Sequence, residues 1–84
     1  MLYQIKLAAK VIKELKKLDK KERSKISKQL VYLAANPFLG KKLQGEWEEH
    51  YSLRAWPYRI IYKIYKEDLV VLVVEIGHRQ GVYN

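Results

Sequence analysis

The residues best suited to chemistry in this sequence are basic and aromatic, and they lie in its last third. Arg54 and Arg59 flank a short turn, and a second group follows near the C-terminal end, with His78, Arg79 and Tyr83. Guanidinium groups bind phosphate oxygens through paired hydrogen bonds, and aromatic rings stack on unpaired bases. This combination indicates a surface that binds RNA.

Other reaction chemistries lack the residues they need. The sequence has no cysteine, and therefore no thiolate nucleophile or thiolate ligand. Ser52 stands two residues from His50, but no third member of a catalytic triad is evident. The two histidines have no carboxylate in a fixed spacing, and no glycine-rich phosphate loop occurs. We therefore predict no cofactor and no metal site.

RNA carries its own nucleophile, the 2′-hydroxyl. A protein that cleaves it must hold this oxygen in line with the phosphorus, neutralise the pentacoordinate anion and protonate the leaving 5′-oxygen. Positioning and electrostatic stabilisation each supply a large share of the rate. Arginines on a rigid scaffold therefore fit cleavage of RNA.

The scaffold follows from the periodicity of the apolar residues. A period of two indicates strands, and a period near 3.6 indicates helices. The predicted elements are a strand over residues 2–7, a helix from residue 8 with its apolar stripe reaching residue 18, a second helix between residues 19 and 36, and strands over 51–54, 58–65 and 69–76. Residues 55–57 are predicted to form a short turn between two of these strands. Asp19 is the expected cap of the second helix, the Asn36–Pro37 pair ends it, and Gly77 ends the last strand.

This β-α-α-β-β-β order predicts an α+β fold in one domain over residues 1–84, an antiparallel sheet with two helices packed on one face. Short turns join the last three strands, which should form an antiparallel meander. The last strand is apolar on both faces, as expected for a central strand.

Alternation along the strands also predicts which side chains share a face. Two sets result: Tyr51, Leu53, Tyr58, Ile60 and Tyr62 toward the helices, and His50, Ser52, Arg54 and Arg59 away from them. We therefore expect both arginines on the sheet face that the helices leave bare. We expect the group that follows Gly77 to converge on the same surface.

The net charge also favours a polyanionic partner. Seventeen Lys and Arg against nine Asp and Glu give +8, a field that attracts nucleic acid, an acidic protein segment or an anionic membrane surface. The N-terminal residues lack a signal-peptide pattern, and the longest aliphatic run, residues 69–74, is far too short to span a membrane. We predict a cytoplasmic protein without a membrane partner.

Several short motifs of the C-terminal half resemble those of the RelE/ParE toxin superfamily. They are Lys42-Leu43-Gln44-Gly45, Tyr51-Ser52-Leu53-Arg54, Pro57-Tyr58-Arg59-Ile60-Ile61-Tyr62, Ile76-Gly77-His78-Arg79 and Val82-Tyr83. The resemblance implies a RelE-like, microbial-ribonuclease-like fold. It also implies a ribosome-dependent toxin of a type II toxin–antitoxin system that cleaves mRNA in the A site without metal, and a neutralising antitoxin, which we expect to be acidic and partly disordered.

The resemblance also implies roles for individual residues. Arg59 resembles the arginine that stabilises the phosphate transition state, and Arg79 the one near the leaving group. Tyr83 resembles the tyrosine that stacks on or orients the substrate base, and Arg54 matches a basic position on its strand.

The sequence departs from the family pattern where the best-known members carry lysines, at His50 and Ser52. Imidazole titrates near neutral pH, so His50 and His78 both remain candidates for the general base. The predicted substrate-binding residues are Arg54, Lys41, Lys42 and Trp56.

Two other functions remain open. A ParE-like protein of the same fold would poison DNA gyrase by binding it, because fold does not fix function. A degenerate member that binds only antitoxin would explain the missing strand lysines.

Overall fold

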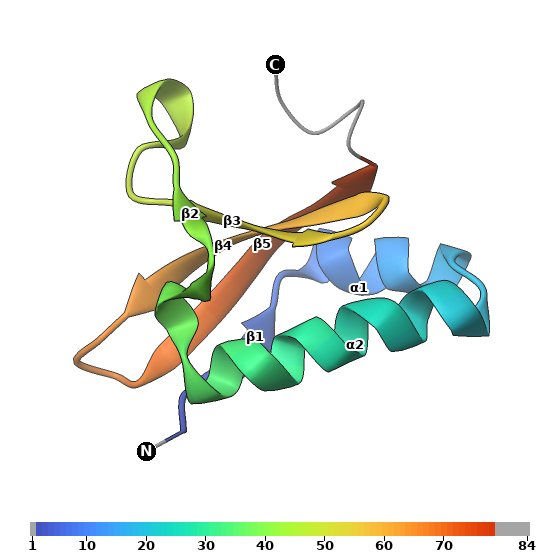
Figure 1. The fold of residues 1–84 in the computed structure, drawn as a ribbon, viewed down its shortest axis with the longest axis horizontal. Coiled ribbons are helices and arrows are strands. Elements are labelled where there is room, and N and C mark those ends of the chain that lie inside the picture. The colour runs from blue at the N-terminus through green and yellow to red at the C-terminus, as the bar shows by residue number, and fades with distance from the viewer. Residues whose placement is uncertain (1, 79–84) are drawn as a thin grey trace.

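The computed structural model describes residues 2–78 and places two helices on one face of a five-stranded sheet (Figure 1). The N-terminal part supplies β1 (Gln4–Leu7), α1 (Ala9–Lys17) and α2 (Lys20–Ala35). Neither of these helices is long and apolar enough to cross a membrane.

The predicted ends of α2 are confirmed. The Asp19 carboxylate accepts a hydrogen bond from the Glu22 backbone N–H at 2.9 Å, which satisfies one of the donors left open in the first turn. The helix ends at Ala35, and Asn36 adopts an extended conformation before Pro37 because the proline ring disfavours the helical region there.

The segment between α2 and the meander is less irregular than predicted. It contains two short 3₁₀ helices, η1 (Pro37–Leu39) and η2 (Gly45–Trp47), and between them a strand of two residues, β2 (Lys41–Lys42). The sequence did not predict β2, because two residues are too few to show a period.

The last three strands form the predicted meander: β3 (Tyr51–Ala55), β4 (Tyr58–Tyr65) and β5 (Val70–His78). The prediction that Gly77 ends the last strand was wrong, since Gly77 pairs with Arg59 and the strand continues to His78. A glycine keeps its backbone N–H and C=O, so it weakens a strand without ending it.

The strand order is β1-β5-β4-β3-β2, with β5 inside the sheet as predicted. The sheet is antiparallel except for one pair, because β1 runs parallel to β5. This parallel pair differs from the wholly antiparallel sheet that we predicted. Alternation shows which residues share a face but not the direction of a strand, and a crossover through two helices is long enough to return the chain in parallel.

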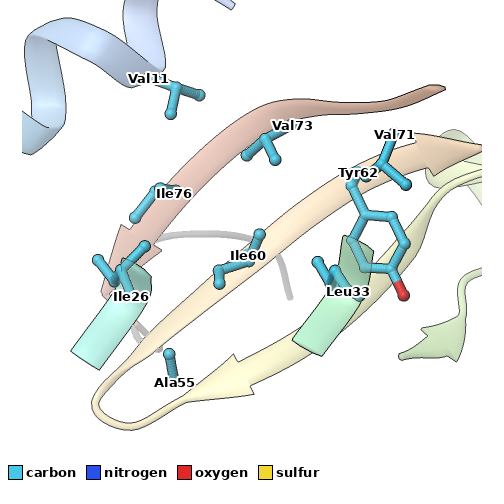
Figure 2. Packing of buried hydrophobic residues seen from close by; sticks show 9 residues of the cluster. All are labelled: Val11, Ile26, Leu33, Ala55, Ile60, Tyr62, Val71, Val73 and Ile76. Carbon is cyan, nitrogen blue, oxygen red and sulfur yellow. The ribbon is translucent and has the colours of Figure 1, made fainter. Parts of the chain in front are cut away.

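The core lies between the helices and the sheet. Figure 2 shows its buried members, and those of the sheet come from β3, β4 and β5: Val11, Ile26, Leu33, Ala55, Ile60, Tyr62, Val71, Val73 and Ile76. Val73 and Ile76 both face the helices although they are three residues apart. A register shift in the β4–β5 ladder beside Ile61 and Tyr62 makes this possible, because a β-bulge adds one residue to a strand.

Tyr62 attaches η1 and β2 to this core. Its buried hydroxyl donates a hydrogen bond to the Pro37 carbonyl at 2.8 Å and accepts one from the Gly40 N–H at 2.9 Å. Burial raises the pKa of Tyr62 to about 12 despite the Gly40 hydrogen bond, which lowers it. A Cβ on Gly40 would lie 2.8 Å from the Ser52 carbonyl oxygen, so only glycine fits this close approach.

Candidate functional site

Arg54 and Arg59 face each other across the turn between β3 and β4. They are direct partners in the antiparallel register, so their side chains leave the sheet on one face. Their neighbours in the ladder, Leu53 with Ile60 and Ala55 with Tyr58, pack on the helix side, so the arginines lie on the opposite face, as predicted. We call this face the open face.

Gly77 continues the arginine row on β5, where it is the register partner of Arg59. Since glycine has no side chain, this position leaves the space beside the Arg59 guanidinium unfilled by β5. The row therefore consists of two cations followed by a position without a side chain.

Two further rows extend the positive charge over the open face. Lys41 pairs with Ser52, which pairs with Ile61, and Leu72 of β5 has Lys63 on one side and Lys6 on the other. Neither Lys63 nor Lys6 was predicted as a site residue, although Lys63 lies four residues after Arg59 in the same alternation.

The acidic side chain of the open face is already in an ion pair. Glu75 is the register partner of Ile61, and its carboxylate is bound by Lys10 from α1. Because this carboxylate is partly neutralised, the open face keeps a positive potential.

The centre of the open face is buried. Ser52 is 6% exposed and Ile61 is fully buried, although neither belongs to the core between helices and sheet. Among residues 2–78 the Ser52 hydroxyl has no hydrogen-bond partner. We had expected a polar, exposed face, and this part of that expectation was wrong.

His50 stands just before β3 in line with Ser52. Its Nδ1 lies 3.1 Å from the Glu48 carbonyl oxygen, and its ring packs edge-on against Trp47 at 5.3 Å between centroids. A carbonyl oxygen only accepts, so this contact places the proton on Nδ1 and leaves the lone pair on Nε2. The ring is therefore fixed in a form that can take up a proton at Nε2.

His78 is placed differently from the expectation. It is the register partner of Tyr58, which packs toward the helices, and the two rings meet edge to face at 5.9 Å between centroids. In-register partners share a face, so His78 lies on the helix side and not beside Arg59. The structure therefore does not bring His78 and the arginines onto one surface.

The predicted substrate-binding residues are divided between surfaces. Lys41 and Arg54 lie on the open face, whereas Lys42 pairs with Tyr51 on the helix side and lines a cavity of about 450 Å³. Trp56 lies in the β3–β4 turn with 54% of its surface exposed. Arg79 and Tyr83 lie outside the described residues.

Within residues 2–78, no three His, Asp or Glu side chains gather in a way that could hold a metal ion. The chemical resources of the site in this part of the chain are thus guanidinium and ammonium groups, one oriented imidazole and one buried hydroxyl.

A family model described as ParE toxin of type II toxin–antitoxin system matches residues 5–83. Two proteins of Escherichia coli show the similarity in sequence. One, named as a RelE-like toxin protein, is 35% identical and covers all of this chain and 93% of its own length. The other, the mRNA interferase toxin RelE of strain K12, is 30% identical and covers 95% of this chain and 86% of its own length.

Solved structures show the same relationship. The toxin–antitoxin complex RelBE2 from Mycobacterium tuberculosis contains a chain that is 25% identical, with a TM-score of 0.87, covering 94% of this chain and all of its own. The archaeal RelE–RelB complex from Pyrococcus horikoshii gives 25% identity and a TM-score of 0.83, with 98% of this chain and all of the other covered. These structures share the sheet and both helices with the chain described here.

Proposed function

The chain belongs to the RelE/ParE superfamily of toxins from type II toxin–antitoxin systems, and on that premise we propose that it is an endoribonuclease that cleaves messenger RNA in the ribosomal A site. The observation that carries the proposal is the direct cross-strand pairing of Arg54 with Arg59. Two guanidinium groups that leave neighbouring strands on one face can bind the same phosphate through paired hydrogen bonds. Their placement supports a phosphate site at this pair.

In the proposed reaction the 2′-oxygen of the RNA forms a bond to phosphorus while the bond from phosphorus to the 5′-oxygen breaks. His50 takes the 2′-hydroxyl proton at Nε2, and Arg59 neutralises the equatorial oxygens of the pentacoordinate anion. Arg54 binds a phosphate group of the same RNA molecule and so holds the RNA in place. The resemblance supports Arg79 near the leaving 5′-oxygen, which receives a proton, and Tyr83 against the substrate base.

The test is induced expression of the wild-type chain and of Arg59→Ala, scored for growth and for new mRNA ends by primer extension. Wild type should arrest growth and produce ends within codons, and Arg59→Ala should lose on the order of 10²-fold or more of the cleavage. Arg59→Lys should recover little, since an ammonium cannot form the bidentate contact. Lys13→Ala, a charge deletion on exposed α1, serves as the control. Intact messages during growth arrest would refute the proposal.

A second function is favoured by the description of the matching family model, which names ParE toxins. A gyrase poison acts by binding, so its expression would induce the DNA-damage response without new mRNA ends. The same induction experiment separates the two functions. If expression of the wild-type chain does not affect growth, the result would instead favour a member of the superfamily that only binds an antitoxin.

We also propose an antitoxin as the partner of this chain. Two solved relatives, with TM-scores of 0.87 and 0.83, come from toxin–antitoxin complexes, and the charge of +8 favours an acidic partner.

A further inference from the structure

A basic cavity lies at the edge of the sheet next to the open face. It has a volume of about 370 Å³ and lies between α2 and the β3–β4 turn, lined by Lys25, Lys28, Gln29, Arg54, Ala55 and Trp56. We call it the α2–turn cavity. Arg54 lines this cavity and is also the partner of Arg59, so the cavity is continuous with the proposed phosphate site.

The topology explains why the cavity exists. β2 covers only Tyr51 and Ser52, so in the described part of the chain the outer edge of β3 beyond Ser52 has no strand beside it. α2 packs against β3 there, and Ala55 is the buried contact. The small alanine side chain leaves room between the helix and the turn.

Positive charge lines the α2 side of the cavity. Lys25, Lys28 and Gln29 are three and four residues apart, so they project from one face of α2. The Nζ of Lys25 lies 3.6 Å from Oε1 of Glu22, and this carboxylate partly offsets its charge. Within residues 2–78 neither Lys28 nor Arg54 forms an ion pair, so both charges are available to an anion.

Trp56 supplies an aromatic surface at the mouth of the same cavity. Its indole lies on a tight turn and is more than half exposed, so aromatic surface is accessible at the cavity. A planar ring beside two uncompensated cations matches the two parts of a nucleotide, the base and the phosphate. Gln29 adds an amide that both donates and accepts hydrogen bonds, which suits a base edge.

We propose that the α2–turn cavity binds one unpaired nucleotide of the RNA strand, with its base stacked on Trp56 and its phosphate held by Lys28 and Arg54. This subsite rests on the proposed function only in that the chain acts on RNA. It lies beside the phosphate site, so it holds a nucleotide that flanks the cleaved bond. It binds single strands, because a base inside a duplex cannot reach the indole.

The experiment measures binding of a short fluorescein-labelled single-stranded RNA to the full chain by anisotropy. Trp56→Leu should weaken binding about tenfold, whereas Trp56→Phe keeps an aromatic ring and should retain most of the affinity. Lys28→Gln should lower the slope of log affinity against log salt by about 0.7, the value for one phosphate contact on a single strand. Lys13→Gln on α1 removes the same charge elsewhere and should change the slope little.

Three results would contradict the proposal that this cavity binds a nucleotide. They are an unchanged affinity in Trp56→Leu, equal losses in Lys13→Gln and Lys28→Gln, and equal binding of a duplex RNA of the same length. Competition by an acidic peptide that is insensitive to Trp56→Leu would assign the surface to a protein instead. Circular dichroism of each variant confirms that the fold is intact.

Arg59→Ala separates this inference from the proposed function. That variant should lose mRNA cleavage and still show the effect of Trp56→Leu on binding. If the wild-type chain binds RNA through Trp56 but produces no new mRNA ends, the proposed nuclease activity is refuted and the proposed nucleotide site still stands. If the chain cleaves mRNA but Trp56 contributes nothing to RNA binding, the nucleotide site is refuted and the nuclease activity still stands.

Discussion

The proposed function depends on Arg54 and Arg59, two residues that are partners in the β3–β4 register. Both side chains stand on one face of a two-strand ladder, where opposed positions lie about 5 Å apart between Cα atoms. In the proposed function both guanidinium groups bind the phosphate of the RNA. The row ends at Gly77, and this keeps the neighbouring strand from crowding Arg59.

The two histidines, equal candidates in the sequence, differ in their surroundings. His50 follows the alternation of the open face and has an oriented ring, while His78 packs against Tyr58 on the helix side. His50 is therefore the better-placed base.

We predict that His50→Ala lowers the rate of mRNA cleavage by about 10²- to 10⁴-fold, the usual contribution of a general base. His78→Ala is the matched control and should retain most of the rate. A larger loss in His78→Ala than in His50→Ala would reverse the assignment.

At the scale of elements, β2 is held at the edge of the sheet by a side-chain contact of Tyr62, which the periodicity of the sequence does not predict. The hydroxyl of Tyr62 binds backbone groups on both sides of η1, and the ring stacks on Tyr51 at 5.6 Å between centroids. The close approach at Gly40 brings β2 beside β3. Lys41 reaches the open face through this attachment.

The raised pKa of Tyr62 predicts how stability depends on pH. Its ordinary value is 10.0 and its value in the folded chain is about 12, so the folded state holds this proton more tightly than the unfolded state. The contribution is fully present below pH 10 and is lost as pH rises through about 12. Over this interval the single proton lowers the folding equilibrium constant by up to about tenfold per pH unit.

We therefore expect Tyr62→Phe to be less stable by about 1–3 kcal/mol near neutral pH, because two backbone groups lose their partner. Its stability should also fall less steeply than that of wild type between pH 10 and 12. Chemical denaturation across this pH range measures both effects. Tyr65→Phe, the same change at an exposed site, should behave as wild type. Parallel pH curves for wild type and Tyr62→Phe would contradict the assignment.

For the whole molecule, the charge distribution favours two kinds of partner. Ten basic and three acidic residues fall between positions 6 and 28, so the helices add to the positive field of the sheet. A ribosomal RNA surface and an acidic protein segment both respond to this field. Toxicity and neutralisation can thus compete for the same charges.

We predict that the chain co-purifies with the acidic product of an adjacent reading frame, and that co-expression of this product restores growth. Coupled folding of a disordered segment over a basic surface gives a complex whose association slows as salt is raised. The measurement is pull-down with growth rescue, and an unrelated acidic protein of equal charge is the control. Rescue by that control, or a well-behaved and harmless chain without any partner, would count against a dedicated antitoxin.

The sequence by itself determined the order of the elements and the side of the sheet for most residues. Alternation placed Arg54 and Arg59 on one face, and the cap at Asp19 and the stop at Pro37 set the ends of α2. These features are local, because they depend on residues a few positions apart. For that reason they could be predicted from one sequence.

Only the tertiary structure decided the features that depend on long-range pairing. The parallel direction of β1, the β-bulge beside Ile61 and the short strand β2 follow from packing between distant segments. The same pairing separated His78 from the arginines, buried Ser52, and formed the α2–turn cavity around Trp56. Periodicity shows on which face of its own helix or strand a residue lies. It does not show which distant segment packs against that face.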